Sequence, residues 1–123
     1  MRLAIVGSRH CPGLSLEQVV EKIPINCTEI VSGGSRGVDD LARQAAQALG
    51  IPLKVYRPDY ARHGRAAPLM RNDLIVQRAH YVLAFWDGSS RGTAYTIREC
   101  IRRHVPVRVI LLPKLPKSAE PGP

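Results

Sequence analysis

Short apolar runs alternate along this chain with longer segments whose apolar residues recur at helical spacing. The runs at residues 3–6, 29–32, 53–56, 81–86 and 107–112 are rich in Val, Ile and Leu, as in strands buried on both faces. Helical patterns lie between them, at residues 15–23, 38–49, 68–79 and 92–104. Since right-handed crossovers return each strand to one sheet, the pattern predicts an α/β fold, a Rossmann-like three-layer sandwich with a mostly parallel five-stranded sheet.

Local signals place several of the helix ends. Ser15 and Gln18 form a capping box, Gly50 stops the second helix, and Pro68 opens the third after a basic loop. The inner face of the fourth helix is expected to carry four residues at helical spacing, Ala94, Ile97, Ile101 and His104. We expect a single domain over residues 1–113 and a flexible tail rich in Pro and Lys over residues 114–123.

Composition narrows the class of protein. A chain of 123 residues that is 45% apolar can build one compact core, and a net charge of +8 favours acidic partners such as nucleotides or nucleic acid. No apolar stretch approaches the roughly 20 residues that span a bilayer, and the chain enters a strand without a basic leader. We therefore expect a soluble, cytoplasmic protein with no membrane partner. Three widely spaced cysteines and histidines without metal-ligand spacing predict no disulfide framework, no metal and no cofactor.

Three of the predicted strands end at a turn that contains the same Ser-Arg pair. The turns are Gly7-Ser8-Arg9, Gly33-Gly34-Ser35-Arg36-Gly37 and Gly88-Ser89-Ser90-Arg91-Gly92-Thr93. The carboxyl ends of neighbouring parallel strands lie along one edge, where glycine amides, hydroxyls and three guanidinium groups would face one crevice. Because such an edge binds anions, we predict a phosphate site for a nucleotide or a nucleotide-derived molecule.

Four motifs, in order along the chain, resemble one known family. They are Ile5-Val6-Gly7-Ser8-Arg9 and the segments at residues 31–39, 64–72 and 84–93. Together they span nearly the whole predicted domain and resemble the SLOG superfamily, which includes the SMF/DprA and LOG proteins, and within it the small YspA/YpsA-like proteins. The resemblance implies a Rossmann-like fold, often dimeric, that binds nucleotides or nucleotide-derived molecules at the strand ends.

The resemblance also raises an enzymatic alternative, a LOG-like phosphoribohydrolase or N-glycosidase acting on nucleoside monophosphates. LOG proteins carry the pattern Pro-Gly-Gly-x-Gly-Thr-x-x-Glu, in which the Glu and a distant Arg support cleavage of the N-glycosidic bond. In this chain the residue three beyond Thr93 is Thr96, whose hydroxyl cannot replace a carboxylate. The remaining catalytic candidates are Arg71, which matches the position of the LOG Arg, Asp87 and Glu99. We expect binding without robust hydrolysis.

The candidate ligand-binding residues come from the three turns and from the third helix. They are Gly7, Ser8, Arg9, Gly33, Gly34, Ser35, Arg36, Gly37, Asp39, Arg71, Asn72, Asp87, Ser89, Ser90, Arg91, Gly92 and Thr93. Structural roles compete at several positions: the glycines could serve only tight turns, and Thr93 could be only a helix N-cap. Arg9 could pair with Asp39, and Asp39 could instead hold Arg36 or a ribose hydroxyl. Arg71 could be a solvated surface residue.

Structural roles also compete with function at the end of the fourth strand and in the helix after it. Asp87 could stabilise its turn through its side chain, and Glu99 could pair with Arg102 or Arg103. Trp86 could stack a purine ring or belong to the core. In the first loop, Cys11 could be an inert small residue or a thiol with a lowered pKa.

Three classes of function follow from these observations. The leading hypothesis is a nucleotide-binding or sensing module, and the second is the LOG-like hydrolase. The third is DprA-like nucleic-acid binding, supported by the charge and opposed by the small number of aromatic residues. A homodimer is also considered, because apolar residues spread around the third helix, namely Leu69, Met70, Leu74, Ile75 and Val76.

Overall fold

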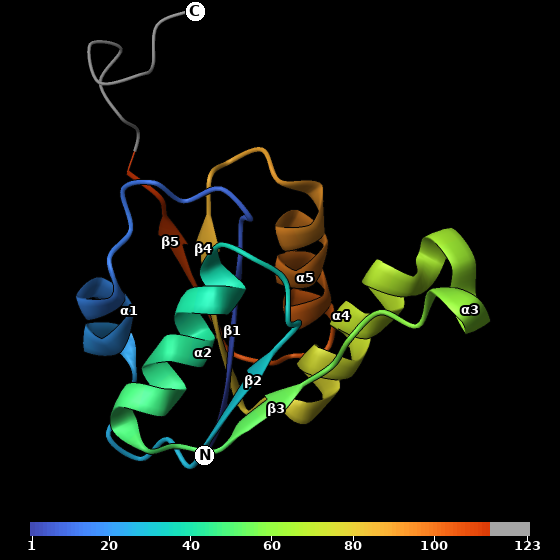
Figure 1. The fold of residues 1–123 in the computed structure, drawn as a ribbon. Coiled ribbons are helices and arrows are strands. Elements are labelled where there is room, and N and C mark those ends of the chain that lie inside the picture. The colour runs from blue at the N-terminus through green and yellow to red at the C-terminus, as the bar shows by residue number, and fades with distance from the viewer. Residues whose placement is uncertain (114–123) are drawn as a thin grey trace, which may run out of the picture.

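A parallel β-sheet forms the middle layer of the molecule (Figure 1). The computed structural model describes residues 1–113, and the predicted tail at residues 114–123 lies outside the described residues. The strands are β1 (Arg2–Gly7), β2 (Glu29–Ser32), β3 (Leu53–Val55), β4 (Tyr81–Trp86) and β5 (Val107–Leu111). They pair in the order β3-β2-β1-β4-β5, and every pair is parallel. The predicted Rossmann-like α/β class is confirmed.

Helices cover both faces of this sheet. The helices α1 (Leu16–Lys22) and α2 (Val38–Leu49) lie on one face, and α4 (Ala67–Arg78) and α5 (Arg91–Arg102) lie on the other (Figure 1). Alternation along β1 divides the core, because Leu3 and Ile5 pack toward α1 and α2 while Ala4 and Val6 pack toward α4 and α5. The predicted capping box at Ser15 is present, with Ser15 accepting from the Gln18 amide.

The basic loop after β3 contains two short elements that the sequence pattern did not predict. They are α3 (Tyr60–His63) and the 3-10 turn η1 (Gly64–Ala66), which project from the body of the molecule (Figure 1). The Asp59 side chain caps α3 by accepting from the Arg62 amide at 3.1 Å. A single turn is too short to show apolar periodicity, so only this cap could have signalled it.

The inner face of α5 agrees with the prediction in part, since Ile97 packs against the core. Its buried residues are Thr93, Thr96 and Cys100, whereas Ile101 is 65% exposed. The helix ends at Arg102, and His104 lies beyond it in the left-handed region, with φ of 59°. The chain turns back toward β5 at His104, where the Val105 amide donates to the Cys100 carbonyl, so His104 does not join the helix face.

The apolar residues of α4 divide between the core and the surface. Ile75 and Val76 are buried, whereas Leu69, Met70 and Leu74 are 41%, 40% and 47% exposed. The homodimer stays a prediction. Within residues 1–113, no helix combines the length and the apolar character needed to cross a bilayer.

The topology fixes where a crevice can form. The chain leaves β1 toward α1 on one face and leaves β4 toward α5 on the other, so the two connections diverge between neighbouring strands. In open parallel sheets, ligand sites lie at such a switch point, outside the carboxyl ends of the strands.

Candidate functional site

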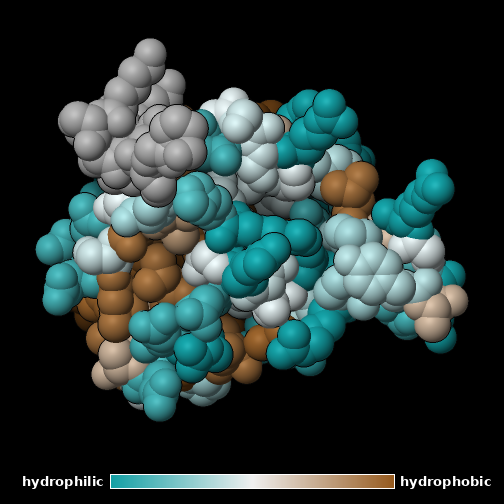
Figure 2. All heavy atoms as spheres, turned by 45° about the horizontal axis from the view of Figure 1, so that its top comes forward, coloured by the Kyte–Doolittle hydropathy of each residue, from teal (hydrophilic) through white to brown (hydrophobic). Residues whose placement is uncertain are grey.

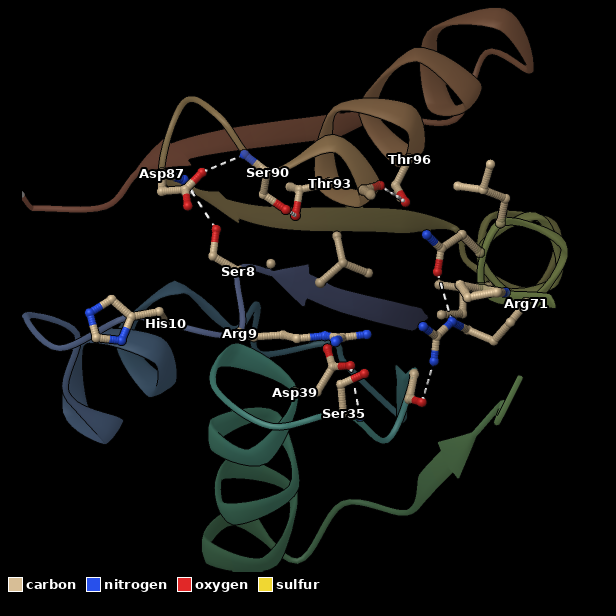
Figure 3. A pocket seen from close by; sticks show the side chains of 18 residues that line it. Ser8, Arg9, His10, Ser35, Asp39, Arg71, Asp87, Ser90, Thr93 and Thr96 are labelled. Atoms are coloured by element: carbon tan, nitrogen blue, oxygen red, sulfur yellow. Dashed lines mark hydrogen bonds between the residues drawn. The ribbon is translucent and has the colours of Figure 1, made fainter. Parts of the chain in front are cut away.

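A cavity of about 510 Å³ lies at this switch point (Figure 3). Twelve of the residues predicted from the sequence line it: Gly7, Ser8, Arg9, Gly33, Ser35, Asp39, Arg71, Asn72, Asp87, Ser90, Gly92 and Thr93. They come from the loops after β1, β2 and β4 and from the start of α4, which lie far apart along the chain. The parallel topology therefore brings the three Ser-Arg turns to one cavity, as expected.

Six predicted residues do not line the cavity, namely Gly34, Arg36, Gly37, Ser89, Arg91 and Glu99. All three turn arginines are exposed, but of the three only Arg9 lines the cavity. Gly37 has a structural role, since its φ is 73° and a Cβ there would collide with the backbone of Ser8 and Arg9.

The second cationic side chain in the cavity wall is Arg71, from the first half of α4. Its side chain is only 7% exposed and donates from Nη1 to the Gly33 carbonyl at 2.5 Å and from Nε to Asn72 Oδ1 at 2.8 Å. Burial lowers the pKa of this guanidinium, and nearby Asp39 opposes that shift. Arg71 is therefore not a solvated surface residue, because it ties α4 to the loop after β2.

Asp39, in the first turn of α2, places a carboxylate in the cavity wall. It is 8% exposed, and its Oδ2 accepts from the Ser35 amide at 3.1 Å. No ion pair joins it to Arg9 or Arg71 within 4.0 Å in the described part of the chain. Burial raises the pKa of Asp39, against the lowering effects of the Ser35 amide and then of Arg71.

Asp87 organises the turn between β4 and α5. Its Oδ1 accepts from the amides of Ser89 and Ser90 at 2.8 and 2.7 Å, as in an Asx turn. These hydrogen bonds lower the pKa of Asp87. The Asp87 amide in turn donates to Ser8 Oγ at 3.3 Å, which joins the turns after β1 and β4 (Figure 3). The alternative in which Asp87 stabilises its turn through its side chain is borne out, and Asp87 also lines the cavity.

The amino ends of α2 and α5 both lie at the cavity, but they differ in the hydrogen bonding of their first amides and in the charge of their first turns. At α2, the Val38 amide donates to the Ser8 carbonyl at 3.1 Å, and Asp39 and Asp40 lie in the first turn. At α5, Ser90 is the N-cap without a side-chain cap bond, the first turn has no acidic residue, and the first capping hydrogen bond comes from the Ala94 amide. Within the described residues, the amides of Gly92 and Thr93 therefore have no acceptor. The N-cap of α5 is Ser90, so the alternative in which Thr93 serves only as the N-cap is wrong.

Asn72 lies beside the amino end of α5. Its Oδ1 is taken by Arg71, which leaves the Nδ2 amino group as a donor. That group lies 3.9 Å from the place a Cβ on Gly92 would occupy, so it adds a donor at the first turn of α5.

The remaining candidates have partners of their own. Glu99 accepts from Arg102 at 2.6 Å and from Arg103 at 3.2 Å, which bears out the predicted ion pair. The Trp86 indole donates to the Ser90 carbonyl at 3.0 Å and does not line the cavity. Burial raises the pKa of Cys11, so the hypothesis of a thiol with a lowered pKa is wrong.

Several cavity residues were not among the predicted binding residues. These are Val6, His10, Pro68, Leu69, Ile75 and Thr96. The sequence had singled out Thr96 only as the place where a LOG protein carries Glu; its Oγ1 donates to the Gly92 carbonyl at 3.0 Å and is almost fully buried. His10 directly follows the first Ser-Arg pair, and this position could have predicted that it lines the cavity.

The middle of the face that carries the cavity is hydrophilic, with a hydrophobic area beside it (Figure 2). Figure 2 turns the upper side of Figure 1 toward the viewer and shows hydrophilic residues gathered in the middle of that face. Within residues 1–113, no three His, Cys, Asp or Glu side chains gather in a way that could hold a metal ion.

Fold and cavity together define a Rossmann-like protein with a polar crevice at the switch point of its sheet. The chain belongs to the YAcAr family, described as the YspA, cpYpsA-related SLOG family, which matches residues 1–63. The resemblance found from the sequence motifs is confirmed at the level of the family.

Two known proteins are similar to this chain. The Gene 61 protein of Mycobacterium phage D29 is 33% identical over 84 residues, which are 63% of this chain and 67% of that protein. The fold matches that of DNA processing protein A from Helicobacter pylori, described for its single-stranded DNA binding mode, with a TM-score of 0.71 and 20% identity over 89% of this chain. This chain spans 64% of the length of that structure.

Proposed function

We propose that the cavity binds the phosphate group of a nucleotide or a nucleotide-derived molecule, and that the protein acts as a binding or sensing module. The observation that carries the proposal is the amino end of α5, where the Gly92 and Thr93 amides are free of acceptors at the cavity wall. Such amides and the helix dipole favour an anion, by about 0.3–1 kcal/mol for the dipole alone.

The surroundings of this helix end support the same ligand chemistry. Arg9 and the Asn72 amino group add donors at the cavity wall. The Ser8 side chain is engaged with Asp87, since its Oγ accepts from the Asp87 amide and its hydroxyl lowers the pKa of the Asp87 carboxylate. The amino end of α2 is a poorer anion site, because the Ser8 carbonyl occupies its first amide and Asp39 adds negative charge. We therefore assign the phosphate to the turns after β1 and β4 rather than to the glycines after β2.

The absence of a carboxylate at Thr96 favours binding over hydrolysis. Thr96 has its hydroxyl engaged with Gly92, and Glu99 is held outside the cavity by two arginines. The Glu with which LOG proteins stabilise an oxocarbenium-like transition state therefore has no equivalent at Thr96.

The experiment compares two variants of the same shape at Gly92. A Cβ at this position meets only the Asn72 amino group, at 3.9 Å, so both Gly92→Asp and Gly92→Asn fit. Aspartate in a first helical turn supports folding yet repels a bound anion. We expect Gly92→Asp to lose phosphate and nucleotide affinity at least about tenfold relative to Gly92→Asn, which has the same shape but carries a neutral amide with N–H donors in place of the charged carboxylate.

Binding is measured by thermal shift and calorimetry with inorganic phosphate, AMP, ADP-ribose, NAD and cyclic nucleotides. A ligand present at 100 times its Kd adds about 2.7 kcal/mol of apparent stability. The proposal fails if none of these ligands binds the wild-type protein, or if the Asp and Asn variants bind equally well.

Binding of single-stranded DNA is the second candidate, supported by the net charge of +8 and by the likeness in fold to DNA processing protein A. The Trp86 indole is engaged with the Ser90 carbonyl, so it does not provide a free stacking surface for bases. Titration of a labelled strand at two salt concentrations separates the candidates. Binding that persists at high salt would favour the DNA proposal, whereas affinity that vanishes would indicate general charge attraction.

A further inference from the structure

Asp39 has hydrogen-bonding capacity that the described protein does not use. A carboxylate offers about four acceptor positions. The Ser35 amide donates to Oδ2 at 3.1 Å, and the Ser35 hydroxyl and the guanidinium groups of Arg71 and Arg9 lie near enough to lower the pKa of Asp39, which still leaves acceptor positions for a ligand. The side chain is 8% exposed and lines the cavity, where Figure 3 shows it on the side opposite Ser90 and Thr93. A carboxylate that is buried with open acceptor positions is stabilised by a donor that arrives with a ligand.

The neighbouring carboxylates lack this combination of burial and open positions. Asp40, the next residue, accepts from Arg43 on Oδ1 and from Gln44 on Oδ2. Asp87 is exposed, and its Oδ1 is filled by the Ser89 and Ser90 amides. Asp39 is therefore the carboxylate of the cavity wall that combines burial with open acceptor positions, whereas Asp87 also lines the cavity but is exposed to water.

The charge of Asp39 also restricts what can lie against it. A phosphate beside this carboxylate would be repelled, whereas a neutral group with O–H donors would form hydrogen bonds assisted by the charge. With the phosphate at α5, the group that reaches Asp39 is the part of the ligand that follows the phosphate. In a nucleotide that part is the sugar, which carries hydroxyl donors.

We propose that Asp39 accepts the 2-hydroxyl of the ligand's ribose, the hydroxyl that 2-deoxyribose lacks, and thereby makes the cavity selective for ribose over 2-deoxyribose. This inference rests on the proposed binding of a phosphate ester at α5. It assigns Asp39 as the residue that determines sugar specificity.

The test uses sugar phosphates without a base, so that an amino group on a base cannot supply the donor. Ribose 5-phosphate and 2-deoxyribose 5-phosphate are titrated calorimetrically into the wild-type protein and into Asp39→Asn. We expect the wild type to prefer the ribose compound by about tenfold or more, the factor that a hydrogen bond to a charged group supplies. In Asp39→Asn, which can still accept from the Ser35 amide, we expect the preference to fall below about threefold.

Two variants with the same loss of charge serve as controls. Asp40→Asn changes the adjacent residue outside the cavity wall and should keep the full preference for ribose. Asp87→Asn changes the exposed carboxylate at the rim, and loss of the preference there instead of at Asp39 would overturn the assignment.

The outcomes separate this inference from the proposed function. Equal affinity of the wild-type protein for the two sugar phosphates would overturn the role of Asp39 and leave phosphate binding intact, and this comparison needs no variant. If neither sugar phosphate binds but AMP does, AMP and 2′-deoxy-AMP make the same comparison. If none of these compounds and no other ligand of the panel binds, the proposed function itself fails, and the inference fails with it.

Discussion

Arg71 should stabilise the fold as well as shape the cavity, and the change Arg71→Met tests this. Methionine keeps much of the buried apolar length of the side chain but removes every donor. The bonds to the Gly33 carbonyl at 2.5 Å and to Asn72 Oδ1 at 2.8 Å disappear, and so does the longer contact with the Tyr56 carbonyl at 3.5 Å.

The size of the effect follows from these contacts. A hydrogen bond from a charged donor contributes about 1.5–3 kcal/mol, and a buried acceptor left without a partner costs about 1–3 kcal/mol. The Gly33 bond is buried, the Asn72 amide can turn to water, and the Tyr56 contact is too long to count fully. We expect Arg71→Met to lower the free energy of unfolding by about 3 kcal/mol, a large part of the roughly 5–15 kcal/mol typical of a domain.

Urea unfolding at neutral pH measures the loss. The slope against urea concentration should stay the same while the midpoint falls. Arg98→Met is the matched control, because Arg98 is exposed on α5 and makes no hydrogen bond or ion pair within the described residues; its effect should stay within about 0.5 kcal/mol. An Arg71→Met protein as stable as this control would refute the idea that Arg71 holds α4 to the loop after β2.

Two further predictions concern groups on α5. Because Arg102 and Arg103 donate to Glu99, the pKa of Glu99 is lowered from 4.5 to about 2. The stability that this carboxylate contributes is therefore complete above pH 4.5 and is lost as the pH falls toward 2. Glu99→Gln should therefore lose less stability than the wild type between pH 4.5 and 2 in urea unfolding, and equal losses would contradict this. Burial raises the pKa of Cys100 to about 11, so iodoacetamide at about pH 8 should modify it only after unfolding; rapid labelling of the folded protein, seen by mass spectrometry, would contradict the burial.

Much of the fold could be predicted from the sequence because the two periodicities are clear. Five apolar runs became the five strands, and each predicted helix formed within one or two residues of its expected bounds. The apolar periodicity did not predict the end and the exposed face of α5 or the short helix α3. Ile101 has the spacing of an inner residue, yet it lies within α5 and is exposed, and His104 lies beyond the end of that helix. The helix α3 is too short to show a period.

The cavity was predictable in its location and less so in its chemistry. Parallel strands place Ser8, Ser35 and Ser90 at one edge, so their meeting follows from topology. The direction of an arginine side chain does not follow from topology, and Arg36 and Arg91 face solvent instead. The contact between Arg71 and the Gly33 carbonyl joins residues 38 positions apart, which no local pattern reports.

The bond from the Val38 amide to the Ser8 carbonyl has a consequence for molecular recognition. It occupies the amino end of α2 while the amino end of α5 stays open, so main-chain atoms as well as the Asp39 side chain make the two sides of the crevice unequal. If the crevice holds an anion as we propose, a substitution at Asp39 alone should not reverse the orientation of that anion, because the difference between the two helix ends lies partly in the backbone.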